Sequence, residues 1–219
     1  MVLPSVNEAC AWFVETARGA VKAGVLLDAD AVQLLIALSP GDPTIGAAIE
    51  HLEREPEPGT RNPEPGVPAT LAETARQAVT NLRAASAARD EAAAREAVTA
   101  LEHDVLRAYR PSHGLGRFED DVAVALAMLA AYDVGGDETH LMMAEELMLG
   151  AVRRAWDRRM QYGLAANCEA AVALAALATR TGKSEYRERA LEVMHGYGTT
   201  YQEHGVRAAP YISALRMIS

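Results

Sequence analysis

The chain has 219 residues with a formal net charge of −9 at pH 7, and half of its residues are hydrophobic although only 5% are aromatic. With 23% charged residues, 16 glycines and 10 prolines, the composition excludes disordered and collagen-like chains and allows a domain-sized core. The negative charge repels a phosphate backbone, which argues against nucleic acid as a partner. Alanine occurs 44 times, which favours closely packed helices over a sheet of β-branched residues. We therefore predict an all-α protein.

The N-terminal part of the chain has the pattern of three short helices. The first begins after a cap at Ser5 or Asn7, the second follows Asp28, and the third runs from Thr44 to about Glu53. Apolar residues recur every three to four positions in the first two segments, which is the spacing of one face of a helix. These helices form either a small subdomain or the first, degenerate part of a longer array.

A proline-rich stretch interrupts the helical pattern. Five of the ten prolines lie between Pro56 and Pro68, and no helix survives that spacing. The stretch is predicted to be an extended spacer, and the alternative is a ligand for an aromatic-lined groove. It divides the chain into an N-terminal helical region (1–53), a Pro-rich linker or loop (54–68) and an α/α-hairpin repeat domain (69–219).

Longer helices are expected after the linker, separated by loops that contain glycine or proline. Most carry an apolar stripe at helical spacing, which a neighbouring helix must cover. We expect helices from Thr70 to about Ala88, from Asp90 or Glu91 to before Pro111, from about Phe118 to Val134, from after Asp137 through Ala155, from Cys168 to Thr181, from after Ser184 through Tyr201, and from Ala208 to Met217.

An internal repeat is the most informative feature of the sequence. Residues 128–144 align without a gap to residues 174–190, and the turn glycines Gly136 and Gly182 set the period at 46 residues. A repeated α-hairpin needs neighbours to bury both of its faces, so this period predicts an incomplete α/α-hairpin toroid or solenoid array. A third copy, Thr70–Tyr109, has the right length but lacks the glycine turn.

The turn Thr181–Ala190 resembles the T-G-D-x-x-Y-x-x-x-A element of six-hairpin (α/α)6 toroid proteins. Within that group the chain is most similar to the C-terminal helical part of thioredoxin-domain-containing, spermatogenesis-associated proteins, over roughly residues 115–215. The stretches Phe118–Asp121, Ala155–Asp157 and Ala166–Ala171 carry this resemblance. It implies a toroid-like fold and, because the wider group includes sugar epimerases and glycoside hydrolases, a sugar-active enzyme as one possible activity. Six hairpins of this period would need more than 219 residues.

Acidic residues give the only candidates for catalysis. Glu119, Asp120 and Asp121 open a predicted helix and suit general acid/base chemistry or cation binding. The alternative is that they complement the positive end of the helix dipole. A Glu-x-x-His pair at Glu192 and His195 is a single copy of a motif that di-iron bundles need twice, so a solvated surface is favoured and no metal is expected.

Aromatic and polar residues of the repeat region are candidates for ligand binding. Arg153, Arg154, Arg158 and Arg159 are interpreted as complementing a helix C-terminus, with an anion or acidic-partner patch as the alternative. The residues predicted to line a ligand site are Tyr132, Trp156, Tyr162, Asn167 and Tyr197.

These patterns favour a non-catalytic helical-repeat binding or scaffolding module whose concave face takes a protein or a small ligand. The alternative is a degenerate or partner-completed sugar-active enzyme, epimerase-like or glycosidase-like. An open array leaves terminal faces unburied, so we expect a homo-oligomer. No cofactor is expected. Cys10 and Cys168 belong to no ligand spacing and read as free thiols. The longest uncharged apolar run is about half of the ~20 residues that cross a bilayer, and no secretory signal is visible, so we expect a cytoplasmic protein without membrane contact.

Overall fold

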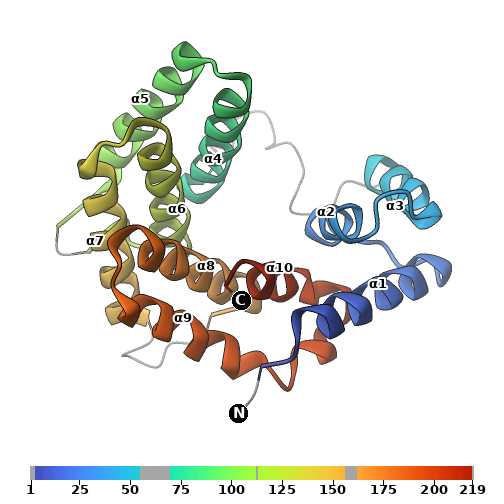
Figure 1. The fold of residues 1–219 in the computed structure, drawn as a ribbon. Helices are drawn as coiled ribbons and strands as arrows, with labels where there is room; N and C mark the ends of the chain where they lie inside the picture. The colour runs from blue at the N-terminus through green and yellow to red at the C-terminus, as the bar shows by residue number, and fades with distance from the viewer. Residues whose placement is uncertain (1–2, 55–69, 112, 156–161, 219) are drawn as a thin grey trace. The chain divides into compact units, whose positions relative to one another are not determined.

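The computed structural model describes residues 3–54, 70–111, 113–155 and 162–218, and within these ranges the fold is all-α, as predicted. No β-strand occurs in the described part of the chain. The elements, shown in Figure 1, are α1 (Val6–Lys22), α2 (Ala29–Leu38), α3 (Pro43–Arg54), α4 (Leu71–Ala88), α5 (Glu91–Ala108), α6 (Phe118–Gly135), α7 (Glu138–Ala155), α8 (Leu164–Thr181), α9 (Ser184–Tyr197), the 3₁₀ helix η1 (Tyr201–Ala208) and α10 (Ala209–Ile218).

Most expected helices occur within a few residues of the predicted bounds, and two differ. Helix α8 begins at Leu164 rather than Cys168, with Gly163 as its N-cap. Helix α9 ends at Tyr197 rather than continuing through Tyr201, and η1 follows it. Glycines at 196 and 198 lower helix stability at that end, which accounts for the early stop.

The glycine turns of the repeat are equivalent in the structure. Gly136 (φ 69°, ψ 13°) and Gly182 (φ 72°, ψ 6°) both adopt the left-handed conformation, and each donates its amide to a carbonyl four residues earlier. In the third copy the corresponding C-cap of α4 is Arg89, at φ 56°. A left-handed residue therefore ends the helix in all three copies, and only two of them use glycine for it.

The chain folds as two compact units. We call Pro68–Arg187 the central unit, and we call Met1–Val67 together with Glu188–Ser219 the terminal unit. The predicted boundary in the Pro-rich stretch falls next to this division, although residues 55–68 lie outside the described part of the chain. The repeat domain expected over 69–219 differs from the central unit, because residues from Glu188 onward cluster with the N-terminal helices.

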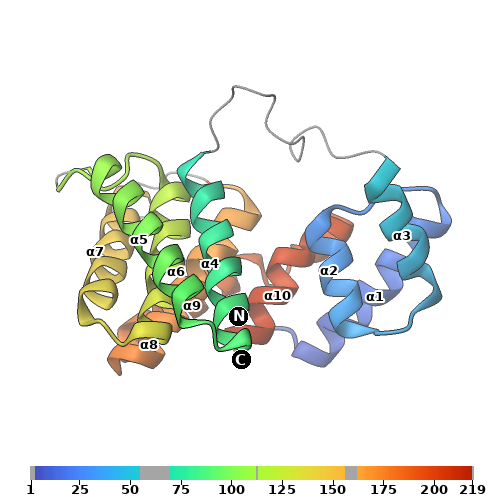
Figure 2. The same ribbon diagram turned by 90° about the horizontal axis from the view of Figure 1, so that it is seen from above.

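Helix α6 is the centre of the central unit. It packs against α4, α5, α7 and α8, as Figures 1 and 2 show. Its sequence predicts a single apolar stripe, but the helix is buried on nearly every side, because Ala123, Val124, Ala127 and Met128 are also covered. Small alanine side chains let several helices approach the α6 axis closely, so the alanine-rich sequence favours this packing.

The terminal unit joins the two ends of the sequence. Helix α1 packs against α2, α3, η1 and α10, and α2 also packs against α10. Three aromatic rings form part of its core: Trp12 meets Tyr201 edge-to-face at 5.2 Å, and Tyr201 stacks on Tyr211 at 4.9 Å. The Trp12–Tyr201 contact joins residues 189 positions apart, which a search for local repeats cannot detect.

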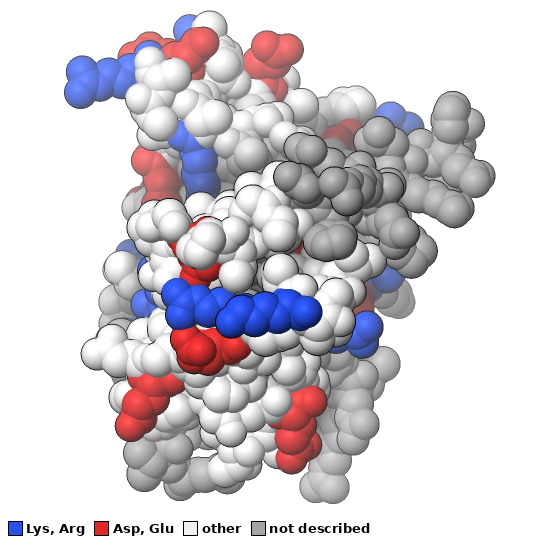
Figure 3. Space-filling view, turned by 90° about the vertical axis from the view of Figure 1, so that its right-hand side faces the viewer, with Lys and Arg blue, Asp and Glu red and all other residues white. Residues whose placement is uncertain are grey.

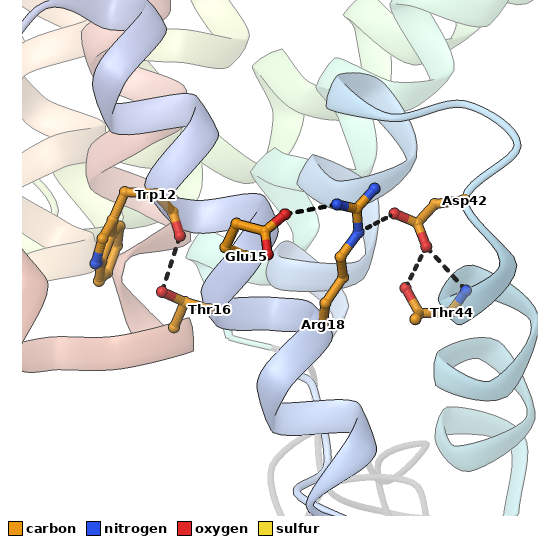
Figure 4. A network of polar contacts seen from close by, with 6 residues as sticks. All are labelled: Trp12, Glu15, Thr16, Arg18, Asp42 and Thr44. Atoms are coloured by element: carbon orange, nitrogen blue, oxygen red, sulfur yellow. Dashed lines mark hydrogen bonds and ion pairs between the residues drawn. The ribbon is translucent and has the colours of Figure 1, made fainter.

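A polar network fixes α3 against α1 in the terminal unit (Figure 4). Asp42, just before α3, accepts hydrogen bonds from the Thr44 hydroxyl at 2.6 Å and the Thr44 amide at 2.9 Å. Its other oxygen accepts from Arg18 Nε at 2.7 Å, and Arg18 Nη1 donates to Glu15 at 2.6 Å. The bonds from Thr44, followed by the interaction with Arg18, lower the pKa of Asp42 to about 2.

We expect the terminal unit to lose stability as the pH falls from 4 to 2. The folded state holds Asp42 ionised down to a pKa of about 2, whereas the unfolded chain protonates it near its ordinary 3.8, so the unfolded state binds more protons in that window. Urea unfolding at several pH values, followed by Trp12 fluorescence in a Trp156→Phe background, measures this loss. Asp42→Asn should flatten the dependence in that window. The control Glu203→Gln, at an exposed carboxylate of the same unit, should leave it unchanged.

No helix in the described part of the chain combines the length and the apolar character that crossing a membrane requires.

Candidate functional site

The loop between α5 and α6 is held in a tight conformation next to the acidic cluster. Arg110 and Gly114 exchange backbone hydrogen bonds of 2.8 and 2.9 Å, and Gly114 has a positive φ of 61°. This loop ends at α6, whose first turn carries Glu119, Asp120 and Asp121. The cluster therefore lies where a loop and a helix start meet, a common position for binding residues.

Asp121 is fully buried and forms the centre of this region. One carboxylate oxygen accepts the Leu115 amide at 2.8 Å, and the other pairs with Nη2 of Arg154, from the last turn of α7. Burial raises the pKa of Asp121 and outweighs the opposing effects of the Leu115 amide and the Arg154 guanidinium. Asp121 thus joins the loop, α6 and α7, rather than facing an open cleft.

Two glycines make room for the Arg154 side chain. A Cβ at Gly114 would lie 2.6 Å from both Arg154 Nη2 and Asp121 Oδ1, and a Cβ at Gly150 would lie 2.8 Å from Arg154 Nη1. Distances this short are not tolerated without displacement of the guanidinium. Arg154 therefore folds back along α7, with its guanidinium held between the loop and the helix.

The other two members of the acidic cluster have structural positions. Asp120 is buried, and its carboxylate accepts the Ala72 amide of α4 at 2.9 Å, so it satisfies a backbone donor in the first turn of that helix. Glu119 is half-buried in the first turn of α6, where a negative charge complements the helix dipole. The three acids are consecutive in the sequence, but their side chains do not converge on one point.

The predicted ligand residues fall into separate places. The Tyr162 ring stacks on Phe118 at 4.2 Å, and Asn167 Nδ2 donates to the carbonyl oxygens of Tyr162 at 2.8 Å and Gly163 at 3.2 Å, at the start of α8. Tyr132 lies fourteen residues further along α6 than Phe118, about 21 Å away at 1.5 Å per residue. Tyr197 belongs to the terminal unit, and Trp156 lies outside the described residues. Among the described residues of the central unit, Tyr162 and Asn167 are therefore neighbours, and Tyr132 lies apart from them.

An open pocket lies beside the Asp121–Arg154 pair. It has a volume of about 200 Å³, and its walls come from the loop after α5 and the C-terminal half of α7. We call it the Arg154 pocket. Its lining residues are Tyr109, Pro111, Gly114, Glu146, Leu147, Gly150, Arg153 and Arg154.

Hydrogen bonds and an ion pair hold the polar groups of the Arg154 pocket in position. The Tyr109 hydroxyl donates to the Glu146 carboxylate, and this bond, with burial, raises the pKa of Tyr109 to about 12. Arg153 is exposed, and its Nε donates to the Leu149 carbonyl at 3.2 Å. The pocket thus presents a carboxylate, a phenol and two guanidinium groups, an arrangement suited to binding charged groups through oriented hydrogen bonds.

Neither a protein-family model, nor a curated protein, nor a solved structure matches this chain.

Sequence reasoning identified part of this pocket and missed the rest. Arg153 and Arg154 were interpreted as complementing a helix C-terminus, with an anion or acidic-partner patch as the alternative, and Arg158 and Arg159 of the same group lie outside the described residues. Tyr109, Glu146 and Gly150 were not selected. The spacing Glu146-x-x-x-Gly150-x-x-x-Arg154 was a usable signal, because it places an acid, a gap and a base on one face of α7. The pairing of Arg154 with Asp121 depends on tertiary contact, and no spacing encodes it.

Other clusters of charged residues connect helices of the central unit. Glu145 pairs with Lys183 and accepts the Tyr186 hydroxyl, which lowers the pKa of Glu145. His140 is buried, and its Nε2 lies 2.8 Å from Glu102 of α5. Within the described ranges no group of three or more His, Cys, Asp or Glu side chains is placed to hold a metal ion.

Charge on the visible surface is mixed. On the face drawn in Figure 3, acidic and basic side chains are interspersed over a largely uncharged surface. A face of this kind gives no extended field of one sign to attract a polyanion.

Proposed function

We propose that this chain is a non-catalytic binding module and that the Arg154 pocket is its ligand site. The observation that carries the proposal is the contrast between the pocket and the acidic cluster beside it. The pocket is open and lined by oriented hydrogen-bonding groups, while Asp120 and Asp121 are buried and bonded to Ala72, Leu115 and Arg154. The sequence predicted binding on a concave face, and this proposal names one pocket as the binding site.

The contacts of the acidic cluster support binding over the sugar-active alternative. Glycoside cleavage needs two carboxylates facing each other across a gap of about 5–10 Å, with one free to give a proton. Asp121 is paired with a guanidinium, and Asp120 is occupied by a helix amide. Neither is directed at a substrate, so a role in fixing the loop and α4 accounts for both.

The wider expectations from the sequence belong to the same proposal. A distant relationship to the (α/α)6 toroid group is supported by the two equivalent glycine turns. Self-association is supported by exposed apolar side chains on the central unit, Leu106 at 74% and Met142 at 64% exposure. A cytoplasmic protein that does not bind nucleic acid is supported by the acidic composition and by the cysteine usage.

A small-molecule thermal-shift screen tests the proposed function. Compounds that bind the pocket should raise the melting temperature of the wild type by several degrees when present at about 100 times their Kd, since binding at that ratio adds about 2.7 kcal/mol. They should have little effect on Arg153→Glu, and they should be recovered chemically unchanged. Conversion of a compound that depends on Asp120 or Asp121 would contradict a non-catalytic role, and a screen without Arg153-dependent binders would contradict the site.

A further inference from the structure

We propose that the Arg154 pocket selects a small zwitterion, a molecule that carries one carboxylate and one ammonium group. A β- or γ-amino acid, in which at least two carbon atoms separate the two charged groups, is an example. The inference rests on the proposed function, because it names the ligand class of the same site. It is carried by three features of the pocket: its volume, its balance of charge and the positions of its charged groups along α7.

The volume of the pocket limits the size of the ligand. At about 200 Å³ the cavity is smaller than the roughly 300–1,000 Å³ of pockets that hold drug-sized molecules. A sugar chain or a nucleotide does not fit in this space, and a molecule of a few carbon atoms does. The walls formed by Pro111 and Leu147 give such a molecule some apolar contact.

The charges at the pocket are balanced. Arg153 and Arg154 supply two positive charges, while Glu146 on the wall and Asp121 behind Arg154 supply two negative charges. A ligand that carries a single charge would be attracted by the pocket groups of opposite sign and repelled by those of the same sign. A ligand with one charge of each sign and no net charge preserves the balance.

The positive and negative groups occupy different levels of α7. Glu146 and Arg153 are seven residues apart, about 10.5 Å along the helix axis. Both arginine side chains fold back toward Glu146: Arg153 Nε reaches the Leu149 carbonyl, and Arg154 Nη1 lies beside Gly150. The guanidinium groups therefore lie closer to the glutamate than their backbone positions suggest, and a short molecule can reach both.

Each end of such a ligand has a specific partner. The planar guanidinium groups bind a carboxylate through parallel hydrogen bonds, which makes arginine the preferred residue for this group. The carboxylate of Glu146 already accepts a hydrogen bond from the Tyr109 hydroxyl. Glu146 is exposed, so the same carboxylate can also accept hydrogen bonds from the ammonium group of a ligand. A phosphate would be repelled by Glu146, and a simple amine would be repelled by Arg153.

Isothermal titration of the full chain with four small probes tests the inference. β-Alanine and γ-aminobutyrate carry both charged groups, propionate carries only the carboxylate, and propylamine carries only the amine. We expect at least one of the two zwitterions to bind about tenfold or more tightly than propionate or propylamine, because each single-charge probe loses one charge-assisted interaction.

Variants on the pocket wall identify the partner of each end. Arg153→Glu and Glu146→Gln should each weaken zwitterion binding by about tenfold or more. Arg95→Glu is a matched control for the first, because Arg95 is an exposed α5 residue whose Nε donates to the Glu91 carbonyl at the same 3.2 Å. Glu96→Gln, at an exposed residue of α5, is the control for the second. Both controls should bind as the wild type does.

The outcomes separate this inference from the proposed function. Binding of propionate as tight as that of both zwitterions and unaffected by Glu146→Gln would overturn the zwitterion class while leaving the pocket as a ligand site. Binding of propylamine alone would overturn it in the same way. If none of the four probes binds while the thermal-shift screen yields Arg153-dependent ligands of another class, the inference fails and the proposed function stands. If neither experiment finds a ligand that depends on Arg153, both fail.

Discussion

Replacing Arg154 by methionine is expected to lower the free energy of unfolding of the central unit by about 3 kcal/mol at pH 7. Removal of one partner from a buried ion pair leaves the other charge uncompensated, which typically costs about 3–5 kcal/mol. We expect the lower end, since the Arg154 side chain is 30% exposed while Asp121 is fully buried. Urea unfolding monitored by hydrogen exchange of peptides from α6 and α7 measures the loss in this unit alone.

The pH dependence of this variant identifies Asp121 as the source of the loss. Burial already raises the pKa of Asp121, and removing the guanidinium that opposes this effect raises it further. Because this pKa is raised, the folded state binds more protons than the unfolded state at pH values above 3.8, the ordinary pKa of an aspartate. The free energy of unfolding should therefore rise as the pH is lowered from 7 to 5. Adding Asp121→Asn should restore part of the stability and remove this dependence.

A surface ion pair of the same type provides the control. Arg180 of α8 pairs with Asp133, whose side chain is 50% exposed, so Arg180→Met should cost about 1 kcal/mol or less. A loss for Arg154→Met that is no larger than the loss for Arg180→Met, and that does not vary with pH, would show that the buried pair does not hold the loop and α7 together.

The helices were predictable because their signals are local. Each helix-end signal lies within a few residues of the helix end that it marks, and the structure has a helix end at each of them. These signals are the capping box at Ser5 and Glu8, the cap at Thr70 and the turn glycines Gly136 and Gly182. The bounds that differ, at the start of α8 and the end of α9, are places where glycine rather than a side-chain cap marks the boundary.

The tertiary arrangement was less predictable, because the local sequence pattern does not specify which helices pack against each other. The repeat indicated that residues 174–190 continue one array, yet residues from Glu188 onward cluster with the N-terminal helices. Within that unit η1 and α10 pack with α1 and α2, and Trp12 of α1 contacts Tyr201 of η1. The local period is a property of the turns, whereas the division into units depends on contacts between residues far apart in the sequence, such as Trp12 and Tyr201.

The candidate site was predicted in its residue types more than in its roles. Asp121 was a candidate acid/base group, with the helix dipole as the alternative, and Arg154 was interpreted as complementing a helix C-terminus. In the structure the two side chains pair with each other. Carboxylates in a first helical turn have the same sequence signature whether they face solvent, a substrate or a buried guanidinium. The tertiary contact decides between these cases: Gly114 and Gly150 leave room for the Arg154 guanidinium beside Asp121.

Replacing Leu129 by alanine is expected to destabilise the central unit by about 3 kcal/mol, since Leu129 lies on α6 and is 2% exposed. Leucine-to-alanine changes in cores cost about 2–5 kcal/mol, and the cost increases when neighbours cannot move into the cavity. The alanines around α6 have no side-chain freedom with which to fill it. Leu106→Ala, at a leucine of α5 that is 74% exposed, is the control and should change stability by about 0.5 kcal/mol or less. Urea unfolding with hydrogen exchange of α6 peptides measures both, and equal effects of the two substitutions would contradict a central, closely packed α6.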